Sequence, residues 1–169
     1  MQQSLVLTVL GSDRTGIVDS LASTVSQHGA SWEESQMARL AGQFAGLVKI
    51  TCPEKEIEAL TTALEGLSAT GLRISVVRNA SLAEQPEQIR YHVDVLGNDR
   101  PGILAEVSHA LRSQNANIVE ITTCIESAPE SGHGIFHTIT TVTLDSKADP
   151  ANLTRALEDL SPDLQVVVS

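Results

Sequence analysis

Two stretches of this chain decide its fold: Leu10-Gly11-Ser12-Asp13-Arg14-Thr15-Gly16-Ile17-Val18 and, 86 positions later, Leu96-Gly97-Asn98-Asp99-Arg100-Pro101-Gly102-Ile103-Leu104. Each stretch follows a short apolar run and begins a segment with helical periodicity. A repeat of sequence and of surrounding pattern indicates two copies of one small structural unit. Each unit carries a glycine-bearing turn at the start of a helix.

The same order of elements is predicted in both copies: strand, helix, strand, strand, helix, strand. In the first copy the expected strands are 4–10, 31–40, 44–52 and 72–77. One helix lies between His28-Gly29 and the turn, and the other between Pro53 and Gly71. In the second copy the expected strands are 88–96, 117–126, 136–144 and 164–168. The main difference is an insertion at 127–134, which contains Pro and two Gly and is therefore expected to be a loop.

This pattern predicts an α+β protein of two domains, residues 1–79 and 88–169, joined by a linker at 80–87. Each domain is expected to have a four-stranded antiparallel sheet with both helices on one face. Domains of about 80 residues bury a modest share of their surface. The long strands 31–40 and 117–126 would also leave unpaired edges. We therefore expect the copies to associate, within one chain or as a homo-oligomer.

The composition argues against direct contact with nucleic acid. Net charge is -10, with 21 acidic and 11 basic residues, of which only three are lysines. The chain has four aromatic residues: Trp32, Phe44, Tyr91 and Phe136. Few side chains can therefore neutralise phosphates or stack on bases. A basic protein is the partner that this charge would attract.

The repeated turn has a direct chemical use. Its glycines allow positive φ and close backbone approach, and the free N–H groups of the helix start favour a carboxylate. Asp13 or Asp99 could cap the helix or accept from a ligand ammonium group, and Arg14 or Arg100 could pair with a carboxylate. The alternative is a turn that only caps a helix.

Two βαββαβ units that each carry this turn resemble ACT domains, which are ferredoxin-like, amino-acid-sensing modules. The resemblance implies ligand binding where the turn of one domain faces a strand of a neighbouring domain. It places the site at Asn98, Asp99, Arg100, Pro101, Gly102 and Ile103, with first-copy equivalents Ser12, Asp13, Arg14, Thr15, Gly16 and Ile17. A side-chain amide both donates and accepts, so Asn98 favours the second copy over Ser12 in the first.

A tandem pair of this length without a catalytic domain is similar to transcriptional regulators of that family. The similarity implies a non-enzymatic sensor with glycine as ligand and a DNA-binding activator of glycine cleavage genes as partner. An alternative is a detached regulatory subunit of an amino-acid or folate-pathway enzyme. A small enzyme on the same scaffold is a third possibility, but no catalytic constellation is visible.

The remaining candidate residues, histidines and cysteines, are not predicted to have a catalytic or metal-binding role. His133 and His137 have a metal-like separation, but a loop and a strand end do not place them on one helical face, so no metal site or cofactor is predicted. Cys52 and Cys124 lie in strand-like runs and are expected to be reduced, small core or near-core residues. The start of the chain shows no signal peptide and no run is long enough for a membrane helix, which predicts a cytoplasmic protein.

Overall fold

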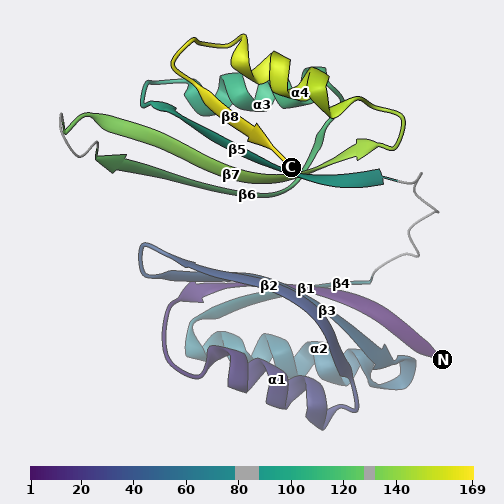
Figure 1. The fold of residues 1–169 in the computed structure, drawn as a ribbon. Coiled ribbons are helices and arrows are strands. Elements are labelled where there is room, and N and C mark those ends of the chain that lie inside the picture. Colours follow the sequence, from purple (N-terminus) through teal and green to yellow (C-terminus); the bar gives the residue numbers. More distant parts are fainter. Residues whose placement is uncertain (79–87, 128–131) are drawn as a thin grey trace. The chain divides into compact units, whose positions relative to one another are not determined.

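The computed structural model describes residues 1–78, 88–127 and 132–169. The chain divides into two compact units, Met1–Ala83 and Glu84–Ser169, which we call the first and second domain (Figure 1). The expected linker at 80–87 lies outside the described residues, as does part of the insertion at 127–134. Each domain is described by itself.

The first domain follows the predicted βαββαβ order. Its elements are β1 (Gln2–Ser12), α1 (Ile17–Gln27), β2 (Ser31–Leu40), β3 (Gln43–Pro53), α2 (Ile57–Gly66) and β4 (Leu72–Arg78). Short 3₁₀ segments, Glu54–Glu56 and Leu67–Thr70, flank α2, so the predicted helix from Pro53 to Gly71 is α-helical only in its centre. The strands form an antiparallel sheet in the order β2-β3-β1-β4.

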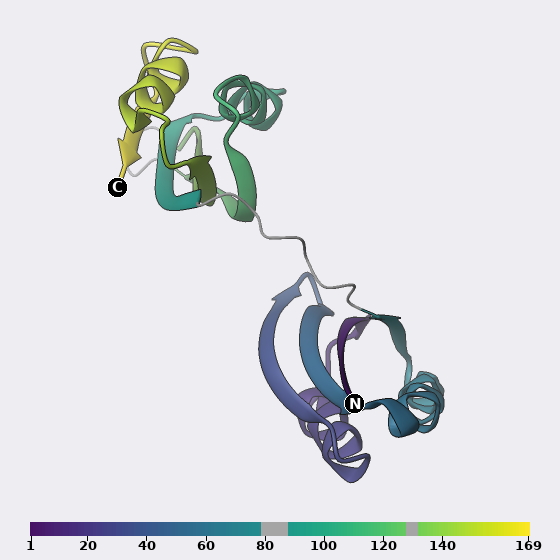
Figure 2. The ribbon, with the colours of Figure 1, turned by 90° about the vertical axis from the view of Figure 1, so that its right-hand side faces the viewer.

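The second domain repeats this architecture. Its elements are β5 (Gln88–Asn98), α3 (Ile103–Ser113), β6 (Asn117–Ser127), β7 (Gly134–Asp145), α4 (Pro150–Glu158) and β8 (Gln165–Val168). The sheet order is β6-β7-β5-β8 and all pairings are antiparallel. In each domain both helices cover the same face of the sheet, as Figures 1 and 2 show from two sides. The predicted α+β class and order of elements are thus confirmed.

One face of each sheet packs on its helices because apolar residues alternate along the central strands. In β1, Leu5, Leu7 and Val9 are buried and the residues between them are not. The helices contribute buried residues at spacings of about four, such as Ile17, Leu21 and Val25 in α1. Each domain therefore encloses its own apolar core, built almost entirely from Leu, Ile and Val.

The turns that bound the first helix of each domain are matched in backbone conformation. Gly16 and Gly102 precede α1 and α3 at φ 89° and 91°. Gly29 and its counterpart Asn115 follow them at φ 63° and 57°. A side chain at the first two positions would be strained, which explains why glycine occurs in both copies of the turn.

The prediction that both cysteines lie in or near the core is wrong for Cys124. Cys52 on β3 is buried in the first core, but Cys124 is exposed. The reason is that Cys124 lies on β6, the edge strand of its sheet, opposite His137 in the ladder. Its side chain belongs to the face that no helix of the second domain covers.

Strands β2 and β6 each form one edge of a sheet and share an irregularity. The ladder register shifts between Trp32 and Glu34 in β2 and between Ile118 and Glu120 in β6, at equivalent positions of the repeat. Such a bulge bends an edge strand and increases its twist. Among the described residues, no helix is both long and apolar enough to cross a membrane.

Candidate functional site

A pocket of about 470 Å³ opens between the start of α3 and the edge strand β6. Four residues predicted for the site lie on its wall: Asp99, Arg100, Gly102 and Ile103. The repeated turn does not identify the rest of the wall, which consists of Leu104, Thr123, Cys124, Ile125 and Phe136. The turn therefore supplies the polar side of the pocket, and the two strands supply a largely apolar side.

The helix start at this pocket has no side-chain cap. Gly102 is the N-cap residue of α3, and no side-chain cap hydrogen bond forms there among the residues that the structure describes. The backbone N–H of Ile103 donates to the Arg100 carbonyl, at 3.2 Å, and that of Glu106 donates to Gly102, at 3.0 Å. The N–H groups of Leu104 and Ala105 thus stand at the positive end of the helix without a capping carboxylate. Asp99 does not cap the helix, and neither does Asp13 in the first domain.

Asp99 is held in place by its backbone. Its N–H donates to the Gly134 carbonyl, at 2.9 Å, which ties the turn to the start of β7. Among the described residues no cation pairs with its carboxylate. Asp99 therefore offers an exposed negative charge at the pocket, whereas the start of α3 offers the positive end of a helix dipole.

Arg100 does pair with a carboxylate, but with one from its own chain. Its Nη1 and Nη2 atoms lie 2.6 Å from the two oxygens of Glu106, one turn into α3. These hydrogen bonds hold the pKa of the Glu106 carboxyl below its usual value. The guanidinium is thus largely occupied, which leaves the backbone N–H groups as the principal anion-binding feature of the pocket.

Two of the predicted site residues lie outside the pocket wall. Asn98 turns toward the loop before β8, where its backbone N–H donates to the Asp163 carboxylate at 3.0 Å. Hydrogen bonds from Ser161 and from the Asn98 backbone lower the pKa of Asp163. Pro101 forms part of the turn and is exposed. The Asn98 amide, which favours the second copy by sequence, is thus not on the pocket wall.

The first domain has the same turn with a different neighbour. The Asp13 N–H donates to Gly42, at 2.9 Å, as that of Asp99 does to Gly134. However, Nη1 of Arg39 on β2 lies 3.3 Å from the Asp13 carboxylate. The residue equivalent to Arg39 on β6 is Ile125, which lines the pocket of the second domain. An arginine thus occupies the acidic group in the first domain, and an isoleucine leaves it open in the second.

The other turn residues of the first domain also do not make the contacts that their counterparts make in the second domain. Arg14 corresponds to Arg100, but the residue equivalent to Glu106 is Ser20, whose hydroxyl donates to the Gly16 carbonyl at 2.9 Å. Ile17 is buried in the first core, as Ile103 is in the second, while Ser12 and Thr15 are exposed. The two turns share a backbone but present different side chains.

The fold and the turn at the start of the first helix define a chain of two ACT domains, and family comparison gives the same result. An ACT-domain model matches residues 3–77 and another matches residues 91–161. The chain belongs to the ACT-domain family.

Its relatives are regulators. The chain is 26% identical over 167 residues to the glycine cleavage system transcriptional repressor of Escherichia coli (strain K12). The aligned region covers 96% of this chain and 86% of that protein. The same figures hold for the Shigella flexneri protein of that name. Family and relatives make this chain a regulatory ACT-domain protein rather than an enzyme.

Two solved structures are similar to this chain over its whole length. A crystal structure of an unknown protein from Galdieria sulphuraria is 30% identical, with a TM-score of 0.85 and coverage of 100% of this chain and 98% of that one. A second, of a protein provisionally described as a glycine cleavage system transcriptional repressor, is 21% identical, with a TM-score of 0.71 and coverage of 100% and 97%. The second likeness establishes the fold alone.

Proposed function

We propose that the second domain binds a small amino acid in the pocket at the start of α3, and that occupancy controls contact with a basic DNA-binding protein. The observation that carries the proposal is the pairing of two opposite features across one pocket. An uncapped helix N-terminus offers N–H groups, and Asp99 offers a carboxylate that pairs with no cation in the part of the chain that the structure describes. A free amino acid is a zwitterion whose two charges match these groups.

The expected pose follows from this charge arrangement. The ligand carboxylate accepts from the N–H groups of Leu104 and Ala105, where the helix dipole favours a negative charge. The ammonium group donates to Asp99. The ligand side chain then faces Ile125 and Phe136. Glycine is the first ligand of the panel, because the named relatives regulate glycine cleavage.

Calorimetric titration of the whole chain with a panel of amino acids tests the site. Asp99→Ala should weaken binding about 10- to 100-fold, since a hydrogen bond to a charged group contributes about 1.5–3 kcal/mol. Asp13→Ala is the matched control in the first domain and should leave the affinity unchanged. Gly102→Val should also block binding, but it strains a residue at φ 91°, so its fold must be checked by circular dichroism.

A more specific variant gives the second domain the arginine that the first domain has at the equivalent position of its edge strand. Ile125 is 64% exposed, so Ile125→Arg fits at the surface and should reach Asp99 as Arg39 reaches Asp13. It should abolish binding without disturbing the core. The reciprocal Arg39→Ile should free Asp13 and leave binding in the second domain intact. Millimolar or absent binding by the wild-type chain, or full affinity in Ile125→Arg, would leave the turn as a structural feature only.

The partner proposal rests on charge. A net charge of -10 and three lysines offer little to a phosphate backbone, whereas a basic protein surface would be attracted. A ligand can control that contact only if it binds the free and partner-bound forms with different affinity.

Affinity capture and gel-shift assays with and without glycine test this step. We expect capture of a DNA-binding protein and no gel shift by the purified chain alone. The association rate should fall as salt rises, because exposed charges are screened over about 10 Å at 0.1 M salt. Direct binding to DNA without a partner would refute the proposal, and capture of an amino-acid or folate enzyme would instead favour a regulatory subunit.

A further inference from the structure

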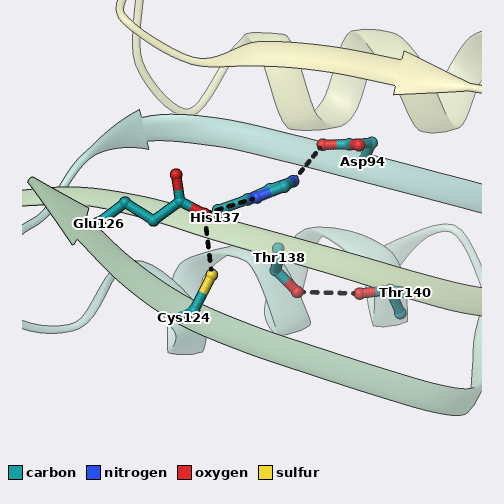
Figure 3. A network of polar contacts seen from close by, with 6 residues as sticks. All are labelled: Asp94, Cys124, Glu126, His137, Thr138 and Thr140. Carbon is teal, nitrogen blue, oxygen red and sulfur yellow. Dashed lines mark hydrogen bonds and ion pairs between the residues drawn. The ribbon is translucent and has the colours of Figure 1, made fainter. Parts of the chain in front are cut away.

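A cluster of three potential metal ligands lies on the uncovered face of the second sheet: Cys124 and Glu126 from β6, and His137 from β7 (Figure 3). Cys124 and Glu126 are alternate residues of one strand and so share a face. The β6–β7 ladder places Cys124 directly opposite His137. The three ligand atoms all lie within 4.8 Å of one another.

We propose that Cys124, Glu126 and His137 bind a divalent transition-metal ion, with Zn²⁺ as the ion of choice. This site adjoins the proposed amino-acid pocket, whose wall includes Cys124, but its argument does not depend on that proposal. A thiolate, an imidazole and a carboxylate form a set that zinc accepts, and three protein ligands leave a fourth position open to solvent.

The spacing of the ligand atoms fits such an ion. Tetrahedral zinc with bonds of about 2.0–2.3 Å separates its ligand atoms by about 3.3–3.6 Å. The Cys124 Sγ lies 3.5 Å from Oε1 of Glu126, and the His137 Nδ1 lies 3.7 Å from the same oxygen. Two of the three ligand pairs are thus already near the separation that zinc requires, and the third lies within 4.8 Å.

A fourth residue orients the histidine. Nε2 of His137 lies 3.0 Å from Oδ1 of Asp94 on the neighbouring strand β5 (Figure 3). In the neutral ring this contact places the proton on Nε2 and leaves the lone pair of Nδ1 facing Glu126. Metal-binding histidines are commonly oriented in this way by a carboxylate.

Electrostatics favour a cation at this place. The Cys124 Sγ lies 3.5 Å from Oε1 of Glu126, and a thiolate so close to a carboxylate is unfavourable without a counter-charge. A divalent ion reverses this balance and displaces the thiol proton. One thiolate, one carboxylate and a neutral imidazole then neutralise a charge of +2.

The cluster is not a requirement of the fold, because the first domain lacks it. The repeat places Ala38, Leu40 and Ala45 at the positions of Cys124, Glu126 and His137, and Thr8 at that of Asp94. Ala38 and Ala45 are opposite each other in the β2–β3 ladder, as Cys124 and His137 are in the β6–β7 ladder. All four polar groups are thus specific to the second domain.

Titration of the metal-free, reduced whole chain with Co²⁺, followed by competition with Zn²⁺, tests the site. We expect one ion per chain, a sulfur-to-cobalt charge-transfer band in the near ultraviolet, and displacement of cobalt by zinc. Zinc should also protect Cys124 from alkylation. Cys52 provides the internal control, because it is buried and should not react in the folded protein with or without metal.

Variants separate a metal site from a hydrogen-bonded surface cluster. Cys124→Ser should remove the charge-transfer band, and His137→Gln should weaken binding at least 100-fold. Asp94→Asn should weaken it about 10- to 100-fold, the usual effect of losing an orienting carboxylate. His92→Gln is the control, since His92 lies on β5 and contacts Thr141 instead.

Absence of the charge-transfer band in the wild-type chain, or unchanged zinc affinity in His137→Gln, would overturn the proposal. His137 is not on the wall of the amino-acid pocket, so this variant should keep amino-acid binding. Loss of metal binding and loss of amino-acid binding are therefore distinguishable.

Discussion

The first glycine of each repeated turn, Gly11 or Gly97, packs against its own domain, and replacing it by alanine should have unequal effects in the two copies. A Cβ on Gly11 would lie 2.7 Å from the Gly71 carbonyl oxygen and 2.9 Å from Cδ2 of Leu72. A Cβ on Gly97 would approach Cδ2 of Leu164 even more closely, but the nearest backbone atom is 3.7 Å away. The added Cβ would therefore overlap a backbone oxygen in the first domain, but only a side-chain methyl group in the second.

The difference in obstacle sets the magnitudes. Ordinary contact for a Cβ begins at about 3.4 Å, so Gly11→Ala would require the Gly71 carbonyl oxygen to retreat by about 0.7 Å. Gly11 is paired with Leu72 at the end of the β1–β4 ladder, so the shift disturbs that pairing. Overpacking costs about 1–3 kcal/mol, and replacing glycine by alanine recovers about 0.5–1 kcal/mol through the unfolded chain.

We therefore expect Gly11→Ala to lower the free energy of unfolding of the first domain by about 2 kcal/mol, which is the upper end of the overpacking range less the gain from the unfolded chain. Gly97→Ala should be nearly neutral, because Leu164 can change rotamer and Gly97 lies beyond the last β5–β8 pair, Leu96 with Gln165. Trp32, the one tryptophan of the chain, packs against the first core. Its fluorescence during urea unfolding therefore reports the first domain, and circular dichroism reports both.

A larger loss in Gly97→Ala than in Gly11→Ala would refute this reasoning, since it would mean that side-chain overlap outweighs backbone overlap. Equal and negligible effects would show that the end of the β1–β4 ladder shifts at little cost in free energy.

The remaining predictions concern the cores, the pH response and assembly. Leu60→Ala should lower the stability of the first domain by about 2–5 kcal/mol and shift the Trp32 transition, whereas Leu153→Ala, also fully buried, should leave that transition in place. Arg100 lowers the pKa of Glu106, so their ion pair stabilises the fold above the ordinary pKa of 4.5, and this stabilisation is lost as pH falls through the lower pKa of the folded state. The difference in unfolding free energy between wild type and Glu106→Gln should therefore vanish in acid. A difference that does not change with pH would contradict the pairing. The open edges β2 and β6 should support association, measured by sedimentation; a monomer whose domains tumble independently in NMR relaxation would rule it out.

The order of elements could be predicted because its signals are local. Gly16 and Gly102 mark the helix starts through their backbone conformation, and Ile17, Leu21 and Val25 mark a helical face by spacing alone. Each of these signals lies within a dozen residues. The duplication then doubles the evidence for every element.

The exposure of Cys124 could not be predicted in the same way. Alternation along a strand separates two faces but does not say which one the helices cover. Strand β6 has apolar residues on both faces and at its bulge, including Ile118, Val119 and Ile121, so its pattern does not identify the core side. The three-dimensional position of the strand at the sheet edge decides the matter.

Half of the candidate site was also beyond sequence reasoning. The turn residues could be named from the repeat, but Thr123, Cys124 and Ile125 join them only through the pairing of β6 with β7. The insertion between these strands hides that register from a count of residues. The exchange of Arg39 for Ile125 is visible in the aligned repeat, but its meaning depends on the contact between Arg39 and Asp13.

The constant offset of 86 between residues 10–40 and 96–126 has a consequence for the history and the engineering of this chain. Strand, turn, helix, the left-handed residue after the helix and the bulge of the edge strand all keep it, without a gap. A bulge that was already present when the gene segment duplicated explains its occurrence at the same place twice. The two segments therefore correspond residue for residue, and chimeras that carry two copies of either one would separate the contribution of the shared backbone from that of the diverged side chains.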